Sequence, residues 1–489
     1  MTERERRFGA RGAALRHNAA RGTLVNTAFL SSLSALGLLR GFVLAGFLTA
    51  SDFGVWGIVM VSLALVAAVQ GAAIGDRYIR QDDDDQEVAF QRAFSISVLL
   101  AGACLAASLV LIPLLSLVYD EPRIVAPGLV LALIFLASPL QLPIWFHYRR
   151  MDFVRQRTLQ AVDPVVAFAV SLALAVAGAG YWALVVGAVA GPWASGAVAA
   201  LRSPYAFRWN YDRGTLREYW NFSWPLMLAS AGGLLIAQAA FLATDAHLGL
   251  AAVGALTLAS TITLFTDRID QLVTGTLYPA IVAVRDRADL LYESFVKSNR
   301  LALMWAVPFG LGLSLFCGDL VAFVLGDKWA QAVPLLEVMG IVAAANHIGF
   351  NWTAYFRAAG DTRPMAVASA AAVVAFLAVG IPGLLLYDLR GLAIGIAAQA
   401  LAHVAVRAIY LARLFDGFAF LRHALRAVLP SLPALAAVLA VRALETGERT
   451  AAVAAGELAL YLLVTLVATW LIEGRLLREA VGYLRSRTA

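Results

Sequence analysis

The stretch FSISVLLAGACLAASLVLIPLLSLV, residues 94–118, runs for 25 residues without a charged side chain. A run of about 20 apolar residues is long enough to cross the hydrocarbon layer of a bilayer as a helix. Only helices and closed barrels satisfy their backbone hydrogen bonds in that layer. Arg92 precedes the stretch and Arg123 follows it closely, so both ends of the predicted helix are marked by charge.

Comparable apolar stretches recur along all 489 residues of the chain, which is 61% hydrophobic and 14% charged. Soluble globular proteins carry about 25% charged residues. The chain is therefore expected to be an all-α integral membrane protein with 14 transmembrane helices. The predicted spans are residues 23–48, 55–79, 94–118, 124–147, 159–178, 182–201, 219–243, 253–282, 301–325, 333–356, 365–386, 392–412, 424–441 and 451–472.

The positions of the 38 Lys and Arg residues indicate the topology. Thirty of them lie in the two terminal tails and in, or at the edges of, every second gap between spans. Loops rich in Lys and Arg stay in the cytoplasm, so both termini are predicted to be cytoplasmic and the number of crossings even. The opposite gaps hold only Arg123, Lys328, Arg390, Arg442 and Arg449.

The net charge of +6 follows from these loops and is no sign of a nucleic-acid partner. Such basic loops orient the chain and contact lipid headgroups, so membrane lipids are the expected partners. Residues 1–22 are predicted to be a cytoplasmic tail and not a signal peptide, because no short apolar core with a cleavage site follows them. The acidic run at 82–85 predicts a solvated loop, and Cys104 and Cys317 lie inside spans, so we expect neither a metal site nor a disulfide.

A faint internal repeat predicts two similar lobes. The loop segments 47–56 and 247–256 align Leu48 with Leu248 and Gly54 with Gly254, six predicted helices apart. Parallel repeats of this kind enclose a central cavity. The predicted organisation is therefore a tail 1–22, a six-helix lobe 23–201, a cytoplasmic linker 202–218, a second six-helix lobe 219–412, two additional helices within 413–472 and a tail 473–489.

Charged residues inside spans are the first candidates for function, because they are costly there and usually face the interior of the bundle. In the eighth span, Asp267, Asp270 and Gln271 lie at helical spacing beside Arg268, which can offer a fork of donors to a phosphate. Arg40 in the first span is an equivalent candidate for an anionic headgroup. A structural ion cluster, or a position near the interface, is the alternative for each of them.

The tenth span carries polar and aromatic residues, Asn346, His347, Asn351 and Trp352, which suit either binding of sugars or packing between helices. Asp163 is a weaker candidate. Arg407, with His403 four residues before it, is expected to snorkel toward its helix end. Residues 285–300 show helical spacing of apolar side chains and predict an amphipathic helix lying at the membrane surface.

Signatures of catalysis and of nucleotide binding are missing from the sequence. It contains no GxxxxGK[ST], HExxH or GxSxG motif, and no gap between spans exceeds about 20 residues. We therefore expect no catalytic residue, no metal and no cofactor. Any active transport would use an ion gradient, the membrane potential or a substrate gradient.

Four segments resemble the polysaccharide transporters of the MOP flippase superfamily, and the resemblance extends to about residue 415. FLTASDFG at 47–54 resembles the turn after their first helix, and WNFSWPLM at 220–227 the opening of their second lobe. LGDKWAQAVPLL at 325–336 is similar to their L-G-x-x-W-x-x-A loop and is the most specific piece. AGDTRP at 359–364 resembles the cytoplasmic turn that follows.

The resemblance implies a flippase of the bacterial inner membrane. Its substrate would be an undecaprenyl-pyrophosphate-linked oligosaccharide, moved to the outer leaflet by alternating access. A polysaccharide polymerase and glycosyltransferases are the protein partners it suggests. Arg268 matches a position where the family often has Arg, whereas Gly46, Ala239 and Ala240 replace charged residues that the family often has, which raises the weight on Arg40 and Arg268.

Two other functions stay open. An ion-coupled exporter of drugs or small molecules belongs to the same superfamily and would depend on one acidic residue. A membrane glycosyltransferase or ligase would need acidic catalytic residues in a sizeable outer loop, and the predicted outer loops are only a few residues long.

Overall fold

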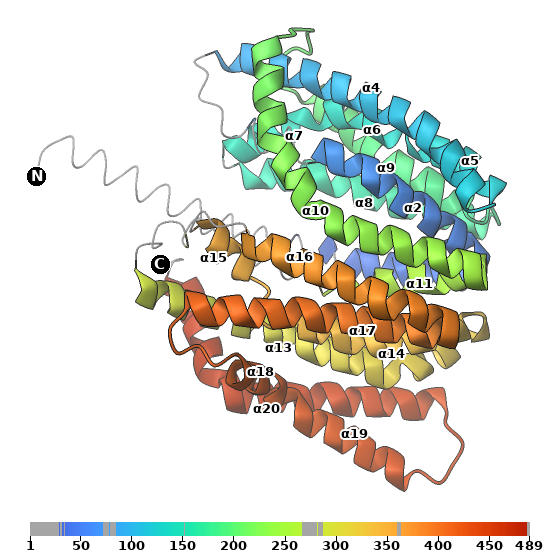
Figure 1. Ribbon diagram of the computed structural model, residues 1–489, viewed down its shortest axis with the longest axis vertical. Coiled ribbons are helices and arrows are strands. Elements are labelled where there is room, and N and C mark those ends of the chain that lie inside the picture. The colour runs from blue at the N-terminus through green and yellow to red at the C-terminus, as the bar shows by residue number, and fades with distance from the viewer. Residues whose placement is uncertain are drawn as a thin grey trace, which may run out of the picture. The chain divides into compact units, whose positions relative to one another are not determined.

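The computed structural model describes residues 29, 32–33, 35–71, 78, 85–150, 152–266, 281, 287–358 and 363–486. Every regular element in these ranges is helical (Figure 1). The chain divides into two compact units, Met1–Thr257 and Leu258–Ala489, and the boundary falls inside helix α11 (Leu250–Thr263). The predicted tail 1–22 lies outside the described residues.

The first unit consists of long helices and, between α4 and α8, three shorter α-helices. Their bounds are α2 (Ala50–Gly71), α4 (Gln86–Val118), α5 (Val125–Leu131), α6 (Ile134–Ala137), α7 (Leu142–Arg149), α8 (Phe153–Val176), α9 (Trp182–Leu201) and α10 (Arg213–Leu248). Aspartates begin three of them, because a carboxylate at the N-cap accepts hydrogen bonds from the free amides of the first turn. Asp85 caps α4, Asp152 caps α8 and Asp212 caps α10. The last residue of the acidic run at 82–85 is thus a helix cap.

The second unit follows the same plan. Its helices are α13 (Ala288–Leu320), α14 (Val333–Asn346), α15 (Trp352–Ala358), α16 (Arg363–Ala375), α17 (Ile381–Leu414), α18 (Phe420–Val428), α19 (Leu432–Leu444) and α20 (Ala451–Ser486). The helix predicted at 285–300 is present from Ala288 on, and it continues without a break into the next membrane span as α13. Its position at the membrane surface stays a prediction. The apolar side chains that suggested the helix pack inside the unit, and Phe295 is fully buried among aromatic residues.

Ten segments of the described residues are long and apolar enough to cross a membrane. They cover eleven of the fourteen predicted spans, because the segment Arg363–Leu414 contains two of them. Inside α17, Tyr387 and Asp388 leave helical geometry, and Asp388 adopts a positive φ of 54°. The chain reverses there as predicted between residues 386 and 392. The other three predicted spans, 23–48, 219–243 and 253–282, lie partly outside the described backbone or side chains.

Glycines allow the two halves of this hairpin to touch. A Cβ on Gly391 would lie 1.8 Å from the carbonyl oxygen of Gly383, and one on Gly395 would lie 2.0 Å from the Cα of Gly380. No larger residue fits at such separations, so small residues set the spacing of the helices here, as is common in membranes.

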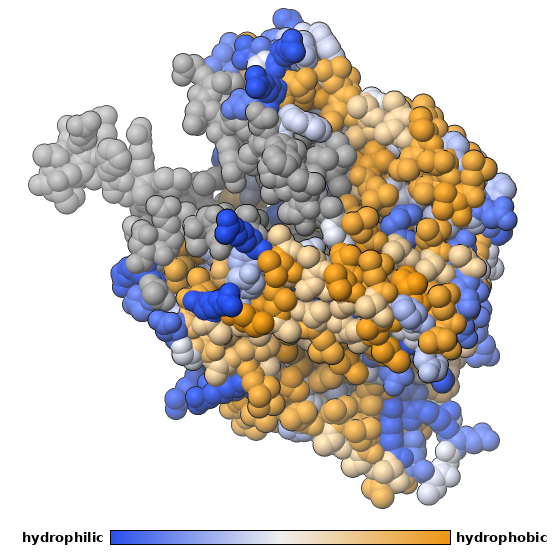
Figure 2. Space-filling view, viewed as in Figure 1, coloured by the Kyte–Doolittle hydropathy of each residue, from blue (hydrophilic) through white to orange (hydrophobic). Residues whose placement is uncertain are grey.

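The helix surfaces are those of a protein surrounded by lipid. On the face drawn in Figure 2, hydrophobic residues cover the flanks of the helices, and hydrophilic residues gather toward helix ends. Large apolar side chains lie exposed along whole helices, for example Leu109, Val110, Leu114 and Leu117 on α4, and Leu462, Leu466 and Leu471 on α20. In water, exposed apolar surface on this scale would mark an interaction site; in a bilayer it is the ordinary outer surface.

Ion pairs tie α20 to α13 at both of its ends. At one end, Arg442 of α19 and Arg449 of the following turn bind two carboxylates in common, Asp319 at 3.0 and 2.5 Å and Glu457 at 2.9 and 2.7 Å. At the other end, Arg300 pairs with Glu473. Between them, the Tyr461 hydroxyl donates to the Pro308 carbonyl at 2.8 Å. The last two spans are therefore fastened to the second unit along the length of α13.

Candidate functional site

Arg40 lies in the helix Ala35–Phe47 and is partly buried. One guanidinium nitrogen, Nη2, donates to the hydroxyl of Ser171 on α8 at 3.2 Å. Asp163, two turns earlier on α8, attracts the guanidinium electrostatically. Among the described residues, Ser171 is its one hydrogen-bond acceptor, although a guanidinium has five N–H donors. Arg40 therefore keeps donors for another anion.

Two glycines of α9 make room for this arrangement. A Cβ on Gly187 would lie 1.9 Å from the Ser171 hydroxyl oxygen, and one on Gly191 would lie 2.2 Å from a carboxylate oxygen of Asp163. Because neither has a side chain, α8 and α9 lie close together and the polar groups that face Arg40 fit between them. Asp163 was predicted as a weak candidate; Ser171 was missed, although it lies on the same broad stripe of α8.

The residues predicted in the tenth span meet at a break between α14 and α15. The helix stops at Asn346, and Gly349 takes a positive φ of 74° before Trp352 begins the next helix. Interrupted helices are found in membrane proteins where neighbouring groups satisfy the released backbone. Here, the Asn299 side chain donates to the His347 carbonyl at 2.9 Å and accepts from the Gly349 amide at 3.0 Å.

His347, Asn351 and Trp352 are buried at the break. His347 is 1% exposed, and its two ring nitrogens lie 2.6 Å from the Ala343 carbonyl oxygen and 3.1 Å from that of Thr266. The Asn351 amide donates to Ser298 at 2.7 Å. Trp352, also 1% exposed, packs edge-on against Phe356. Of the two readings given by the sequence, helix packing accounts for these contacts, and substrate binding at the four predicted residues stays a prediction.

Arg407 corrects one expectation. It does not snorkel to a helix end: it is 4% exposed and donates from Nη1 to the carbonyls of Asn346 and Ile348 at 2.5 and 2.8 Å. His403 lies 3.0 Å from its other terminal nitrogen. The reason is physical: the helix break leaves carbonyls without amide partners in an apolar interior, where an unsatisfied group costs several kcal/mol. Arg407 supplies the donors.

The cluster predicted in the eighth span, Asp267, Arg268, Asp270 and Gln271, lies outside the described residues. Thr266, immediately before it, is fully buried.

Comparisons with known proteins place the chain in a family. A family model described as "Polysaccharide biosynthesis protein" matches residues 43–334. The chain belongs to this family. The match begins three residues after Arg40 and ends in the first turn of α14, so it includes neither Arg40 nor the helix break.

Two relatives of comparable similarity are the lipopolysaccharide biosynthesis protein WzxC of Escherichia coli (strain K12) and the succinoglycan biosynthesis transport protein ExoT of Rhizobium meliloti (strain 1021). The chain is 22% identical to WzxC over 325 residues, which is 64% of either chain. It is 22% identical to ExoT over 311 residues, 61% of either chain. The aligned part thus spans a little under two thirds of the length of these relatives.

The fold of this family member is that of the MOP superfamily. The lipid II flippase MurJ in an inward closed conformation superposes with a TM-score of 0.69 at 11% identity, over 92% of this chain and 99% of that one. A multidrug resistance transporter of the MATE family, inward-facing, superposes with a TM-score of 0.66 at 12% identity, over 80% and 98%. The predicted resemblance to MOP transporters is confirmed.

Proposed function

We propose that this protein moves a polyprenyl-pyrophosphate-linked oligosaccharide from the cytoplasmic to the outer leaflet of the bacterial inner membrane, for the synthesis of a cell-surface polysaccharide. The proposal includes the fourteen-helix, two-lobed plan, alternating access and cytoplasmic termini. Membership of the family supports it, as do two relatives named for lipopolysaccharide biosynthesis and succinoglycan transport. A polysaccharide polymerase and glycosyltransferases are its proposed protein partners.

The observation that carries the proposal is the position of Arg40. It is a permanent cation on a membrane helix, with one hydrogen bond to the described chain and a carboxylate nearby to hold it. Arginine binds phosphate through paired N–H donors. An arginine in this state suits a pyrophosphate that arrives, stays briefly and leaves, because Asp163 and Ser171 keep the guanidinium in place between cycles.

Reciprocal packing of the two repeat segments supports the two-fold plan. A Cβ on Gly54 would lie 2.2 Å from the carbonyl oxygen of Leu250, and one on Gly254 would lie 1.8 Å from that of Ala50. Gly54 thus faces the residue four positions before Gly254, and Gly254 faces the residue four positions before Gly54. Segments related by a two-fold axis produce such reciprocity, and parallel repeats of transporters are related by an axis along the membrane normal.

The test is flipping in proteoliposomes that contain a fluorescent polyprenyl-pyrophosphate-linked oligosaccharide, read by quenching from outside. Wild type should flip the lipid, and Arg40→Ala should lose most of the rate. Arg123→Ala is the control. Arg123 is exposed, takes no part in this site, and pairs with Glu121 at a distance of 2.7 Å. Flipping at the wild-type rate by Arg40→Ala would remove Arg40 from the mechanism, and no flipping by wild type would reject the proposal.

One observation favours the alternative of an ion-coupled exporter. Asp163 is an acidic residue inside a span, partly buried beside an arginine, as a coupling carboxylate would be. Efflux of a soluble compound driven by a pH or sodium gradient, abolished by Asp163→Asn in a chain that flips no lipid-linked glycan, would establish the alternative.

A further inference from the structure

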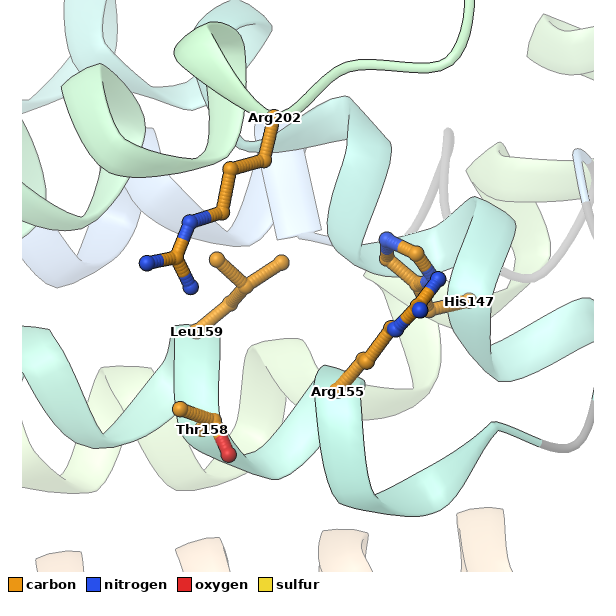
Figure 3. Close-up of a pocket in the computed structure, with 5 residues that line it drawn as sticks. All are labelled: His147, Arg155, Thr158, Leu159 and Arg202. Carbon is orange, nitrogen blue, oxygen red and sulfur yellow. The ribbon is translucent and has the colours of Figure 1, made fainter.

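A basic pocket lies at the ends of helices α7, α8 and α9 in the first unit. It has a volume of about 400 Å³ and is lined by His147, Arg155, Thr158, Leu159 and Arg202. Figure 3 shows Arg202 reaching from the end of α9 toward Leu159, with Arg155 and His147 together on another side of the pocket. The volume falls in the range of about 300–1,000 Å³ that is typical of ligand sites.

The basic side chains of this pocket come from the ends of three different helices. His147 belongs to the last turn of α7, Arg155 to the first turn of α8, and Arg202 follows the end of α9. In the sequence, His147 ends the predicted span 124–147, and Arg155 and Arg202 lie in two different gaps that were both predicted to be cytoplasmic. The structure brings them to one pocket, so the positive charges of two loops act on the same volume.

The charges of the pocket are incompletely neutralised. Asp152 lies 3.5 Å from the Arg155 guanidinium and 3.8 Å from the His147 ring, so it balances about one positive charge. Arg202 has no carboxylate and no hydrogen-bond acceptor among the residues that the structure describes, although the guanidinium carries five donors. The Thr158 hydroxyl is already used, because it donates to the Val154 carbonyl at 2.8 Å.

The pocket is built rather than incidental. His147 is only 7% exposed, so a polar ring is held inside the wall. The Arg150 guanidinium stacks over the neighbouring Phe146 ring, 4.4 Å from the ring centroid. The Ser195 hydroxyl of α9 donates to the Leu159 carbonyl of α8 at 3.1 Å and so links the two helices. The wall therefore has fixed geometry, and the two arginines that line it extend from fixed backbone.

The location indicates what could occupy it. α7, α8 and α9 all end or begin here as membrane-spanning segments, so the pocket lies at the boundary between hydrocarbon and water. Anionic lipid headgroups concentrate at that boundary on the cytoplasmic side. A phosphate matches the cations better than a carboxylate would, because its oxygens point in several directions and the two guanidinium groups approach from different helices.

We propose that this pocket binds the phosphate of a lipid headgroup at the cytoplasmic surface, held between Arg155 and Arg202 with His147 beside them. The phosphate can belong to an anionic phospholipid or to a polyprenyl pyrophosphate, and free inorganic phosphate shares the same chemistry. Binding here requires no transport, so the site goes beyond the proposed flipping activity.

The experiment measures ligand affinity of the purified full chain in a phosphate-free neutral detergent, by native mass spectrometry and by thermal shift. The probes are a short-chain phosphatidylglycerol, undecaprenyl pyrophosphate, inorganic phosphate and an uncharged galactolipid. The double variant Arg155→Gln/Arg202→Gln is compared with Arg208→Gln/Arg213→Gln. The control pair also removes two exposed arginines from this side, but neither lines the pocket.

Wild type should bind at least one of the two phosphate lipids more tightly than the galactolipid. The lining variant should lose that affinity by roughly 10- to 100-fold, as expected for lost hydrogen bonds between charged groups, and the control pair should change it less than about 3-fold. Arg155→Lys/Arg202→Lys, which keeps the charges, should retain part of the binding. That variant also shows that a loss in the glutamine variant is not a folding defect.

The three phosphate arms identify the source. Binding of phosphatidylglycerol alone assigns a phospholipid site, and tighter binding of undecaprenyl pyrophosphate assigns a site for the lipid carrier. Equal affinity in the lining and control variants, binding of inorganic phosphate alone, or no preference over the galactolipid would overturn the proposal. Failure of flipping in proteoliposomes, with phosphate-lipid binding intact, would reject the proposed function and leave this site in place.

Discussion

Arg40 and Arg407 are both arginines inside membrane helices, yet the two units use them differently. Arg407 is 4% exposed and gives hydrogen bonds to two carbonyls that the break after α14 leaves free, with His403 at 3.0 Å. Arg40 is partly exposed and donates one hydrogen bond, to a serine. Arg407 thus satisfies backbone carbonyls of the fold, whereas Arg40 has N–H donors that make no hydrogen bond to the described residues.

The difference shows that depth in the membrane does not by itself identify a binding residue. A buried cation that donates to carbonyls of the chain has a structural role, since its removal would leave those carbonyls unsatisfied in an apolar interior. A cation such as Arg40, held by one hydroxyl and one nearby carboxylate among the described residues, can bind an anionic ligand and release it again. Four predictions test the distinction, taken from the largest expected effect on stability to the smallest.

Arg407→Ala should be the most damaging substitution. It removes the donors that satisfy the carbonyls of Asn346 and Ile348, and losses of this kind cost about 3–5 kcal/mol. We expect a large fall in melting temperature and in the yield of monodisperse protein, measured by fluorescence-detected size exclusion. Arg390→Ala, on the exposed turn within α17, should leave both unchanged. Wild-type stability of Arg407→Ala would show that the comparison is mistaken.

Gly191→Ala should have an intermediate effect. Its new methyl group would meet the Asp163 carboxylate and separate α8 from α9, and overpacking of this kind costs about 1–3 kcal/mol. Because Asp163 helps to hold Arg40, flipping should fall as well. Gly102→Ala in α4 is the control: nothing lies within 4 Å of the added atom, and alanine favours a helix. A neutral Gly191→Ala would mean that close packing of these helices does not position the site.

Arg40→Ala should cost little stability, about 1 kcal/mol, since one hydrogen bond is lost. Flipping should nevertheless fall severely, and Arg40→Lys should restore only part of it, because an ammonium ion lacks the planar fork. Thermal melting and flipping, measured on the same preparations, separate the two effects. Parallel losses in both would make Arg40 a structural residue like Arg407.

The ion pair between Glu121 and Arg123 should have the smallest effect. Hydrogen bonds from Arg123 hold the pKa of Glu121 below its ordinary value, so the pair stabilises the fold above the ordinary glutamate pKa of about 4.3. That contribution is lost as pH falls through the lowered pKa. Because the arginine is exposed, it should be worth less than about 1 kcal/mol. Glu121→Gln should therefore melt slightly earlier than wild type at pH 7, and the difference should shrink as the pH falls below 4 and Glu121 becomes protonated in the folded chain. A difference above about 1 kcal/mol at pH 7 would show that exposed pairs matter here as much as buried donors.

Much of the fold could be predicted because membrane spans depend on local composition. Apolar length and the distribution of arginines identified the hairpin around residues 386–392, although the backbone joins both halves in one helical element. The path of α13 could not be predicted, since the amphipathic pattern at 285–300 fits either a separate helix or the start of a longer one. Only the unbroken backbone of α13 distinguishes them.

The site was harder to predict for a related reason. Asn346, His347, Asn351 and Trp352 were found because polar residues in a span are unusual, but the sequence does not show that Asn299 and Arg407, distant along the chain, satisfy the break among them. Ser171 and the pocket around Arg202 were missed because each depends on helices that meet only in three dimensions. A serine or a loop arginine has no unusual local pattern.

The ion pairs at both ends of α20 have a practical consequence. α20 is linked to α13 near Asp319 and again at Arg300, with Tyr461 between them. These two helices should therefore move together as one rigid body. A fluorophore placed on α20 near the C-terminus would then report displacements of α13 without disturbing it. Deletion of the last helix would leave Arg300 without Glu473, and Arg442 and Arg449 without Glu457, so shortened versions of the chain are poor starting points for crystallisation or engineering.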